Sequence, residues 1–152
     1  MTISASAPDV PAQGDCPLCR PVAEQVVWHD ASCRAILVDD AYYPGFVRVI
    51  WQRHVSEMSD LPGFEQRHLM NVVLAVETAL RGLLQPDKIN LASLGNVVPH
   101  LHWHVIPRFR DDRHFPDPIW ATPRREAIAR TAPDRVTLGV AIESALTEIT
   151  CG

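Results

Sequence analysis

Three histidines separated by single apolar residues form the part of the sequence best suited to chemistry. They are His100, His102 and His104, within the run HLHWHVIPRF over residues 100–109. Alternate side chains of a strand point to opposite faces, so the run predicts one face of imidazoles and one apolar face. Histidine is the side chain whose ordinary charge change lies closest to neutral pH. The run is therefore the first candidate for a functional site.

Three interpretations of the histidines are open. They face solvent on an edge strand, or all three ligate one metal ion, or His102 is a nucleophile that its neighbours orient. The preceding turn, SLGN over residues 93–96, contains Gly95, which permits close backbone approach to an anion. Arg108 and Arg110 follow the three histidines, and guanidinium groups suit phosphate. A phosphate needs such donors more than a metal does, which favours the nucleophile.

The elements that must position these residues follow from hydrophobic spacing. Short apolar runs predict five strands, over residues 26–29, 33–38, 46–51, 88–94 and 100–109. Apolar residues at helical spacing predict a long helix over 62–84, with Asp60 as its N-cap, a short helix over 124–131 and a C-terminal helix over 136–149. Strands and helices do not alternate regularly. The expected fold class is α+β with a mainly antiparallel sheet of about five strands.

Size and charge narrow the functional classes. The 152 residues suit one domain with a core, expected over 16–152 after a flexible N-terminus over 1–15. A net charge of −4 argues against nucleic acid or an anionic membrane as partner. No apolar run reaches the roughly 18 residues of a membrane helix, and the first residues lack the features of a secretory signal. A cytoplasmic location is expected, where the four cysteines are thiols or metal ligands.

Cys16 and Cys19 are spaced as Cys-x-x-Cys, which has several interpretations. The pair is a redox couple, half of a zinc site, or two unrelated thiols. A redox couple usually opens a helix after a strand in a β-α-β unit, and the sequence shows none here. A structural zinc ion would need two further ligands.

The histidine run followed by Pro-Arg resembles the signature of the histidine triad (HIT) family of nucleotide hydrolases and transferases. The likeness extends over roughly residues 16–109. Within it, YPGFVRVI at 43–50 resembles the family's loop and strand, and KIN at 88–90 resembles the strand that enters its phosphate loop. The resemblance implies a HIT-like fold with one long helix and a C-terminal helix. It also implies a homodimer with an intersubunit sheet.

The resemblance implies a reaction as well. His102 would attack the α-phosphorus of a dinucleoside polyphosphate or a nucleotide phosphoramidate, and water would hydrolyse the nucleotidyl-histidine. The other nitrogen of His102 should be fixed as a donor, for example by a backbone carbonyl. No catalytic metal is required. The expected catalytic residues are His102, His104 and His100, and the expected substrate-binding residues are Asn90, Gly95, Asn96 and Arg108.

By position in the family, a structural zinc ion would take two thiolates and two imidazoles, from Cys16, Cys19, His54 and His100. Such a closed tetrahedral set suits structure rather than catalysis. The chain departs from the family at Phe46, where many members carry histidine, and at Asn96, where many carry glutamine. Two alternatives stay open: a nucleotide-binding or scaffolding HIT protein with little turnover, and a metalloenzyme with its ion on all three histidines.

Overall fold

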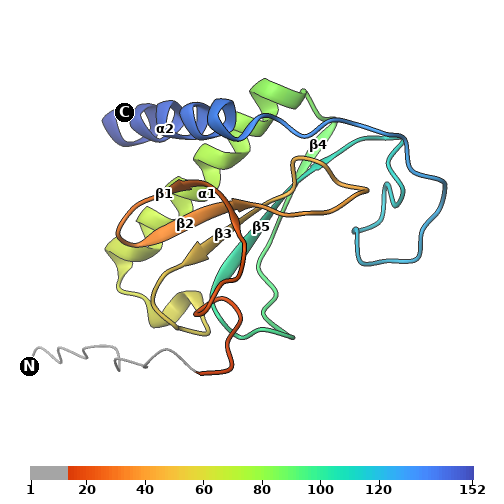
Figure 1. The fold of residues 1–152 in the computed structure, drawn as a ribbon. Helices are drawn as coiled ribbons and strands as arrows, with labels where there is room; N and C mark the ends of the chain where they lie inside the picture. The colour runs from red at the N-terminus through yellow and green to blue at the C-terminus, as the bar shows by residue number, and fades with distance from the viewer. Residues whose placement is uncertain (1–13) are drawn as a thin grey trace, which may run out of the picture.

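Five antiparallel strands form one sheet in the order β1-β2-β3-β5-β4 in the computed structural model, which describes residues 14–152 (Figure 1). The strands are β1 (Gln25–His29), β2 (Cys33–Leu37), β3 (Val47–Trp51), β4 (Lys88–Ala92) and β5 (His102–Arg108). The expectation of an antiparallel sheet of about five strands is confirmed. The histidine strand β5 lies between β3 and β4, so it is not an edge strand.

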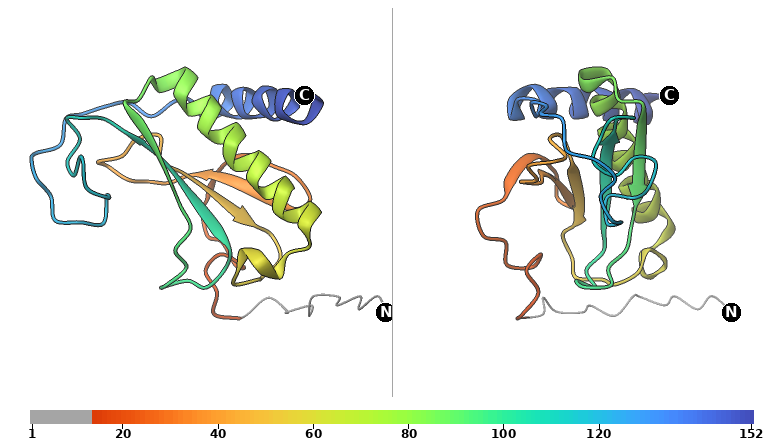
Figure 2. Two further views of the ribbon diagram at one scale, coloured as in Figure 1. Left: turned by 180° about the vertical axis from the view of Figure 1, so that it is seen from behind. Right: turned by 90° about the vertical axis from the view of Figure 1, so that its right-hand side faces the viewer.

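Both long helices lie on the same side of the sheet. Helix α1 (Gly63–Leu84) crosses the back of the sheet in Figure 1, and α2 (Arg135–Cys151) lies beside it, as the reverse view in Figure 2 also shows. The apolar residues that predicted the long helix are buried in one core against β2, β3 and β5, except Leu83, which is exposed. The long helix and the C-terminal helix expected from the sequence are confirmed.

The side of the sheet away from α1 carries most of the polar residues discussed below. Cys33, Val47 and Val105 belong to the core under the helices, so the residues that alternate with them point to the other side. We call this side the histidine face and define it by Arg34, Ile36, Arg48, Ile50, His102, His104, Ile106 and Arg108.

Strand β5 begins at His102, although the sequence predicted a strand from His100. The N–H of His100 donates to Val98 O at 2.8 Å, and the N–H of Leu101 donates to Val55 O at 2.7 Å. These two N–H groups therefore donate to carbonyls of loops and not to a neighbouring strand. The ring of His100 is consequently placed by the turn before the strand.

Two further expectations from the sequence are wrong. Asp60 does not cap the long helix, whose N-cap is Pro62. Asp60 instead ends the short helix η1 (Met58–Asp60), where its carboxylate accepts the N–H of Glu57, the N-cap of η1. No helix forms over 124–131, where the N–H groups of Arg124 and Arg125 donate back to the carbonyl of Arg113.

The sequence predicted a flexible terminus over residues 1–15. Residues 1–13 of this segment lie outside the described residues. No helix within residues 14–152 is both long and apolar enough to cross a membrane.

A long loop follows β5 (Figure 1). It is organised around the buried carboxylate of Asp112. Arg108 Nε donates to it at 2.7 Å, and backbone N–H groups of Phe109, His114 and Phe115 donate at 2.7 to 3.1 Å. Burial by itself raises the pKa of Asp112, but these hydrogen bonds outweigh it and lower the pKa to about 2. The loop is therefore held by an ionised carboxylate.

Asp112→Asn removes that charge and is expected to destabilise the fold by about 2 kcal/mol at pH 5 and above. Because the folded pKa lies below the ordinary value, the stabilisation is present above about pH 4 and is lost as the pH falls toward about 2. Denaturant unfolding of both proteins from pH 5 to pH 2 should show their difference shrinking. A difference that stays constant over this range contradicts the account. Asp111→Asn, on the exposed side of the same loop, is the control, with an effect within about 0.5 kcal/mol.

Two helical glycines provide a matched test of the packing of α2. A Cβ on Gly139 would overlap Val27 O in β1, whereas a Cβ on Gly82 in α1 would meet nothing within 4 Å. Gly139→Ala should cost about 1–3 kcal/mol through overpacking, although alanine is the better helix former. Gly82→Ala should stabilise the fold by about 0.5–1 kcal/mol. Thermal unfolding measures both, and equal stabilisation by the two substitutions would show that α2 does not contact β1 this closely.

Candidate active site

The ring of His102 is held by a backbone carbonyl. Its Nδ1 lies 2.5 Å from His100 O, and a carbonyl only accepts, so Nδ1 carries the hydrogen and Nε2 carries the lone pair. Burial lowers the pKa of His102; the bond to His100 O opposes this effect, and the nearby charge of Arg48 adds to it. The residue keeps 7% of its surface exposed, so the ring is not sealed from solvent. The carbonyl partner expected for its second nitrogen is confirmed.

The ring of His104 lies among three other rings. Its centroid is 4.9 Å from that of His102, 5.6 Å from Phe46 and 5.3 Å from Trp120, whose residue is half exposed. Burial, followed by the charges of His102 and Arg48, lowers the pKa of His104 to about 4. Its Nδ1 is buried and has no hydrogen-bond partner within residues 14–152. Neither ring is solvent-facing, so the edge-strand interpretation of the histidines is wrong.

The glycine turn lies beside His102. Gly95 has φ +73°, a conformation that favours glycine, and Ser93 Oγ donates to His102 O at 2.8 Å. A cavity of about 270 Å³ lies where this turn meets the segment after β3. Ser93, Gly95 and His102 are among its lining residues. Asn96, the next residue of the turn, is exposed.

Arg108 and Asn90 interact with each other. Arg108 is 1% exposed, and its Nη1 donates to Asn90 Oδ1 at 2.6 Å. Its other nitrogens donate to Asp112 and to the backbone carbonyl of Asp117. The guanidinium expected to contact substrate is thus bonded to protein groups, and it orients the amide of Asn90. Arg110 lies beyond the strand, with 83% of its side chain exposed.

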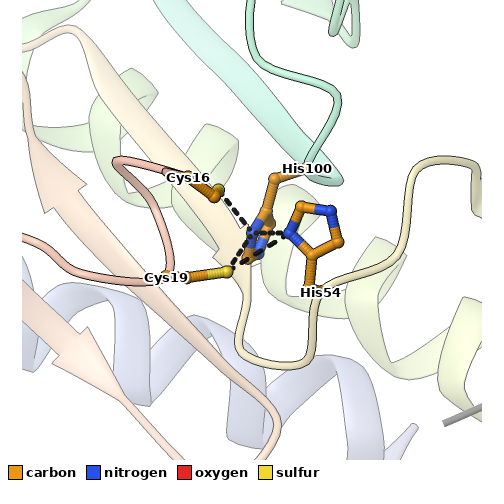
Figure 3. A group of neighbouring side chains, drawn as sticks. All are labelled: Cys16, Cys19, His54 and His100. Carbon is orange, nitrogen blue, oxygen red and sulfur yellow. Dashed lines mark hydrogen bonds between the residues drawn. The ribbon is translucent and has the colours of Figure 1, made fainter. Parts of the chain in front are cut away.

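Two cysteines and two histidines meet at the start of β5 (Figure 3). His54 Nδ1 and His100 Nδ1 are 3.2 Å apart, Cys19 Sγ lies 3.2 and 3.4 Å from these two atoms, and Cys16 Sγ lies 3.4 Å from His100 Nδ1. The four side chains expected as zinc ligands therefore converge. We call them the Cys/His cluster.

The chemistry of this cluster fits zinc. Zinc bonds of about 2.0–2.1 Å to nitrogen and 2.3 Å to sulfur give tetrahedron edges of about 3.3–3.6 Å, close to the separations seen. His100 Nε2 lies 2.6 Å from Trp51 O, so this nitrogen carries the hydrogen and the lone pair of Nδ1 points into the cluster. Burial lowers the pKa of His100, which keeps the ring in the neutral form that a ligand needs.

Arg34 holds the cysteine loop against the sheet, a role that the sequence analysis did not assign. Its Nη2 donates to Leu18 O at 2.9 Å, between the two cysteines, while Nε donates to Glu24 at 2.7 Å. Ser93 and Arg48 are further residues of the site without a predicted role. Strand alternation placed Arg34 and Arg48 on the histidine face, but the hydrogen-bond partners of Arg34 lie in other segments of the chain.

The chain is similar to proteins of one family. A family model described as HIT domain matches residues 20–111. An AP-4-A phosphorylase of Mycobacterium tuberculosis is 31% identical over 80 residues, covering 49% of this chain and 41% of that protein. An asymmetrical bis(5'-nucleosyl)-tetraphosphatase of Schizosaccharomyces pombe is 31% identical over 97 residues, covering 60% and 53%. The matches thus span about half the length of these relatives or less.

Solved structures share the fold over most of the chain. Histidine triad protein blr8122 from Bradyrhizobium japonicum has a TM-score of 0.60 at 30% identity, covering 82% of this chain and 90% of its own. A histidine triad protein from Marinobacter aquaeolei has a TM-score of 0.64 at 25% identity, with the same coverage. A structure of a zinc-bound histidine triad family protein from Mycobacterium smegmatis, at 22% identity, covers 90% of this chain with a TM-score of 0.60. The family model covers more than half of the sequence, and the chain belongs to the HIT domain family.

Proposed function

We propose that the protein is a HIT-type hydrolase or nucleotidyl transferase that works through a covalent nucleotidyl-histidine on His102. The observation that carries this proposal is the bond from His102 Nδ1 to His100 O, because it leaves the lone pair on Nε2. A neutral imidazole with a directed lone pair is a competent nucleophile near neutral pH.

The reaction has two displacements. His102 Nε2 forms a bond to the α-phosphorus while the bond to the leaving oxygen or nitrogen breaks, and the leaving group departs with the electron pair. Water then attacks the same phosphorus and gives up a proton to the solvent. The phosphorus–nitrogen bond breaks, and its electron pair returns to Nε2 to restore the neutral imidazole. A nucleoside monophosphate and the leaving group are the products.

We assign roles in this reaction to the surrounding residues from their positions around His102. His104 lies beside His102 and contacts the phosphoryl oxygens or the leaving group. Gly95 and Asn96 present turn donors to the phosphoryl group, which stabilises charge developing in the transition state. Asn90 contacts the nucleotide with its amide nitrogen, because its oxygen is taken by Arg108. Arg108 acts as a positioning residue.

Dinucleoside polyphosphates are the substrate class that the relatives favour. The curated proteins similar to this chain are named as a phosphorylase of Ap4A and as a bis(5'-nucleosyl)-tetraphosphatase. Nucleotide phosphoramidates fit the same chemistry at phosphorus. A binding protein with little turnover is the second candidate, favoured by the buried Phe46 against His104.

Zinc in the Cys/His cluster would be structural. Cys16, Cys19, His54 and His100 would fill the four tetrahedral positions of the ion and would leave none for substrate. The ion would fix the ring of His100, and through its backbone the carbonyl that bonds His102.

A homodimer is the assembly that we propose, in a cytoplasmic setting and with the nucleotide as small-molecule partner. Strand β4 is an edge of the sheet, and the partly exposed Leu91 and Leu94 lie in it and just after it. An uncovered edge strand is a ready pairing surface for a second copy.

His102→Ala should abolish a covalent adduct and lower turnover by about 10⁴-fold or more. The protein is incubated with Ap4A labelled at the α-phosphorus and quenched in alkali, in which the phosphorus–nitrogen bond survives. Label should remain on the wild type and on His29→Ala, an exposed histidine at the end of β1, and be absent from His102→Ala. Turnover without any labelled protein contradicts the covalent route. Tight nucleotide binding without label or turnover supports the binding protein.

Cys16→Ser with Cys19→Ser should remove one equivalent of zinc per chain and destabilise the fold by about 4 kcal/mol or more. Metal content by mass spectrometry and thermal unfolding measure the two effects. Cys151→Ser, at the exposed end of α2, is the control and should change neither. A purified wild type with less than a tenth of an equivalent of zinc, unchanged in stability when zinc is added, contradicts the site.

A further inference from the structure

Three arginines lie on the histidine face, and two of them are neutralised by carboxylates. Arg34 Nε lies 2.7 Å from Glu24, and Arg108 Nε lies 2.7 Å from Asp112. The third, Arg48, forms no ion pair with any carboxylate of residues 14–152. Its Nε is buried and has no hydrogen-bond partner in that part of the chain.

Arg48 is the cross-strand neighbour of His104. The register of β3 and β5 places the two residues opposite each other, and directly opposite residues have Cβ atoms about 4.5–5.5 Å apart. His104 is 6% exposed, and its Nδ1 is also buried without a partner within the described residues. A buried polar atom left unpaired destabilises the structure. Two such atoms at adjacent positions indicate a site where a bound ligand supplies the missing hydrogen-bond partners.

The charge at this place is positive. Burial lowers the pKa of Arg48 and Glu24 raises it, and a guanidinium remains protonated in proteins. His104 is neutral near pH 7, since its pKa is about 4. Ile36, the neighbour of Arg48 on the β2 side, is apolar and buried, which strengthens the field of the guanidinium. The complementary ligand group is an anion.

We propose that Arg48 binds an anionic group of the substrate beyond the reacting phosphoryl group, and so selects polyphosphate leaving groups over neutral or amine ones. This inference rests on the function proposed above and narrows it to phosphate-rich substrates. A guanidinium offers paired donors that match phosphate oxygens. Arg48 is the one arginine of the described histidine face that forms no ion pair with a carboxylate.

A binding series tests the inference without turnover. Adenosine, AMP and ADP are titrated by calorimetry into the wild type and Arg48→Met in magnesium-free buffer. The wild type should gain affinity from AMP to ADP, and Arg48→Met should bind ADP at least about tenfold more weakly while adenosine binding stays unchanged. Arg48→Lys should restore part of the gain. Arg67→Met, which removes an exposed charge on α1 behind the sheet, should match the wild type.

The results that overturn the inference are distinct. Equal weakening of adenosine, AMP and ADP would show that Arg48 reads the nucleoside or supports the fold. A wild type that gains nothing from AMP to ADP, or an Arg48→Met protein that keeps the gain, also contradicts it.

A kinetic arm links the inference to the reaction. For Ap4A, Arg48→Met should lower kcat/KM at least about tenfold more than it does for adenosine 5'-phosphoramidate, which shares the reacting AMP group. An equal loss on both substrates would overturn selection by the leaving group. If no label forms on His102 although the binding series behaves as expected, the proposed reaction fails while the anion site stands.

Discussion

The proposed role of His102 depends on one hydrogen bond, from its Nδ1 to the carbonyl of His100. Because a carbonyl accepts and never donates, the bond fixes the tautomer and directs the lone pair of Nε2 away from the backbone. The same residue, His100, has its ring in the Cys/His cluster and bonded to Trp51 O. A single residue thus joins the Cys/His cluster to the proposed nucleophile.

Much of this arrangement was predictable from local pattern. Alternation in the histidine run gave the two faces of β5, and the spacing of Leu69, Val72, Val76 and Leu80 gave the buried side of α1. The boundaries that failed did so through contacts outside the pattern. Strand β5 begins later than predicted because the N–H groups of the preceding turn donate to Val98 O and Val55 O. No helix forms over 124–131 because backbone N–H groups at its start donate to Arg113 O.

The site was less predictable than the fold. Burial and hydrogen-bond partners decide whether a charged side chain can contact a ligand, and neither can be read from residue spacing. Arg108 and Arg48 both lie on the histidine face by strand alternation. The sequence predicted Arg108 as a substrate-binding residue because it follows the histidines. The structure bonds Arg108 to Asp112 and Asn90, whereas Arg48 carries an unpaired donor beside His104. No spacing rule separates the two, since the carboxylate that neutralises Arg108 is set by the loop after β5.

The protonation state of His102 is the most direct test of the account. Nitrogen-15 NMR of the labelled protein at pH 7, with and without added zinc, reports which ring nitrogen carries hydrogen. A hydrogen on Nδ1 and a bare Nε2 are the expected result. A hydrogen on Nε2, or on both nitrogens, would leave Nε2 without a lone pair to attack phosphorus and would contradict the central claim.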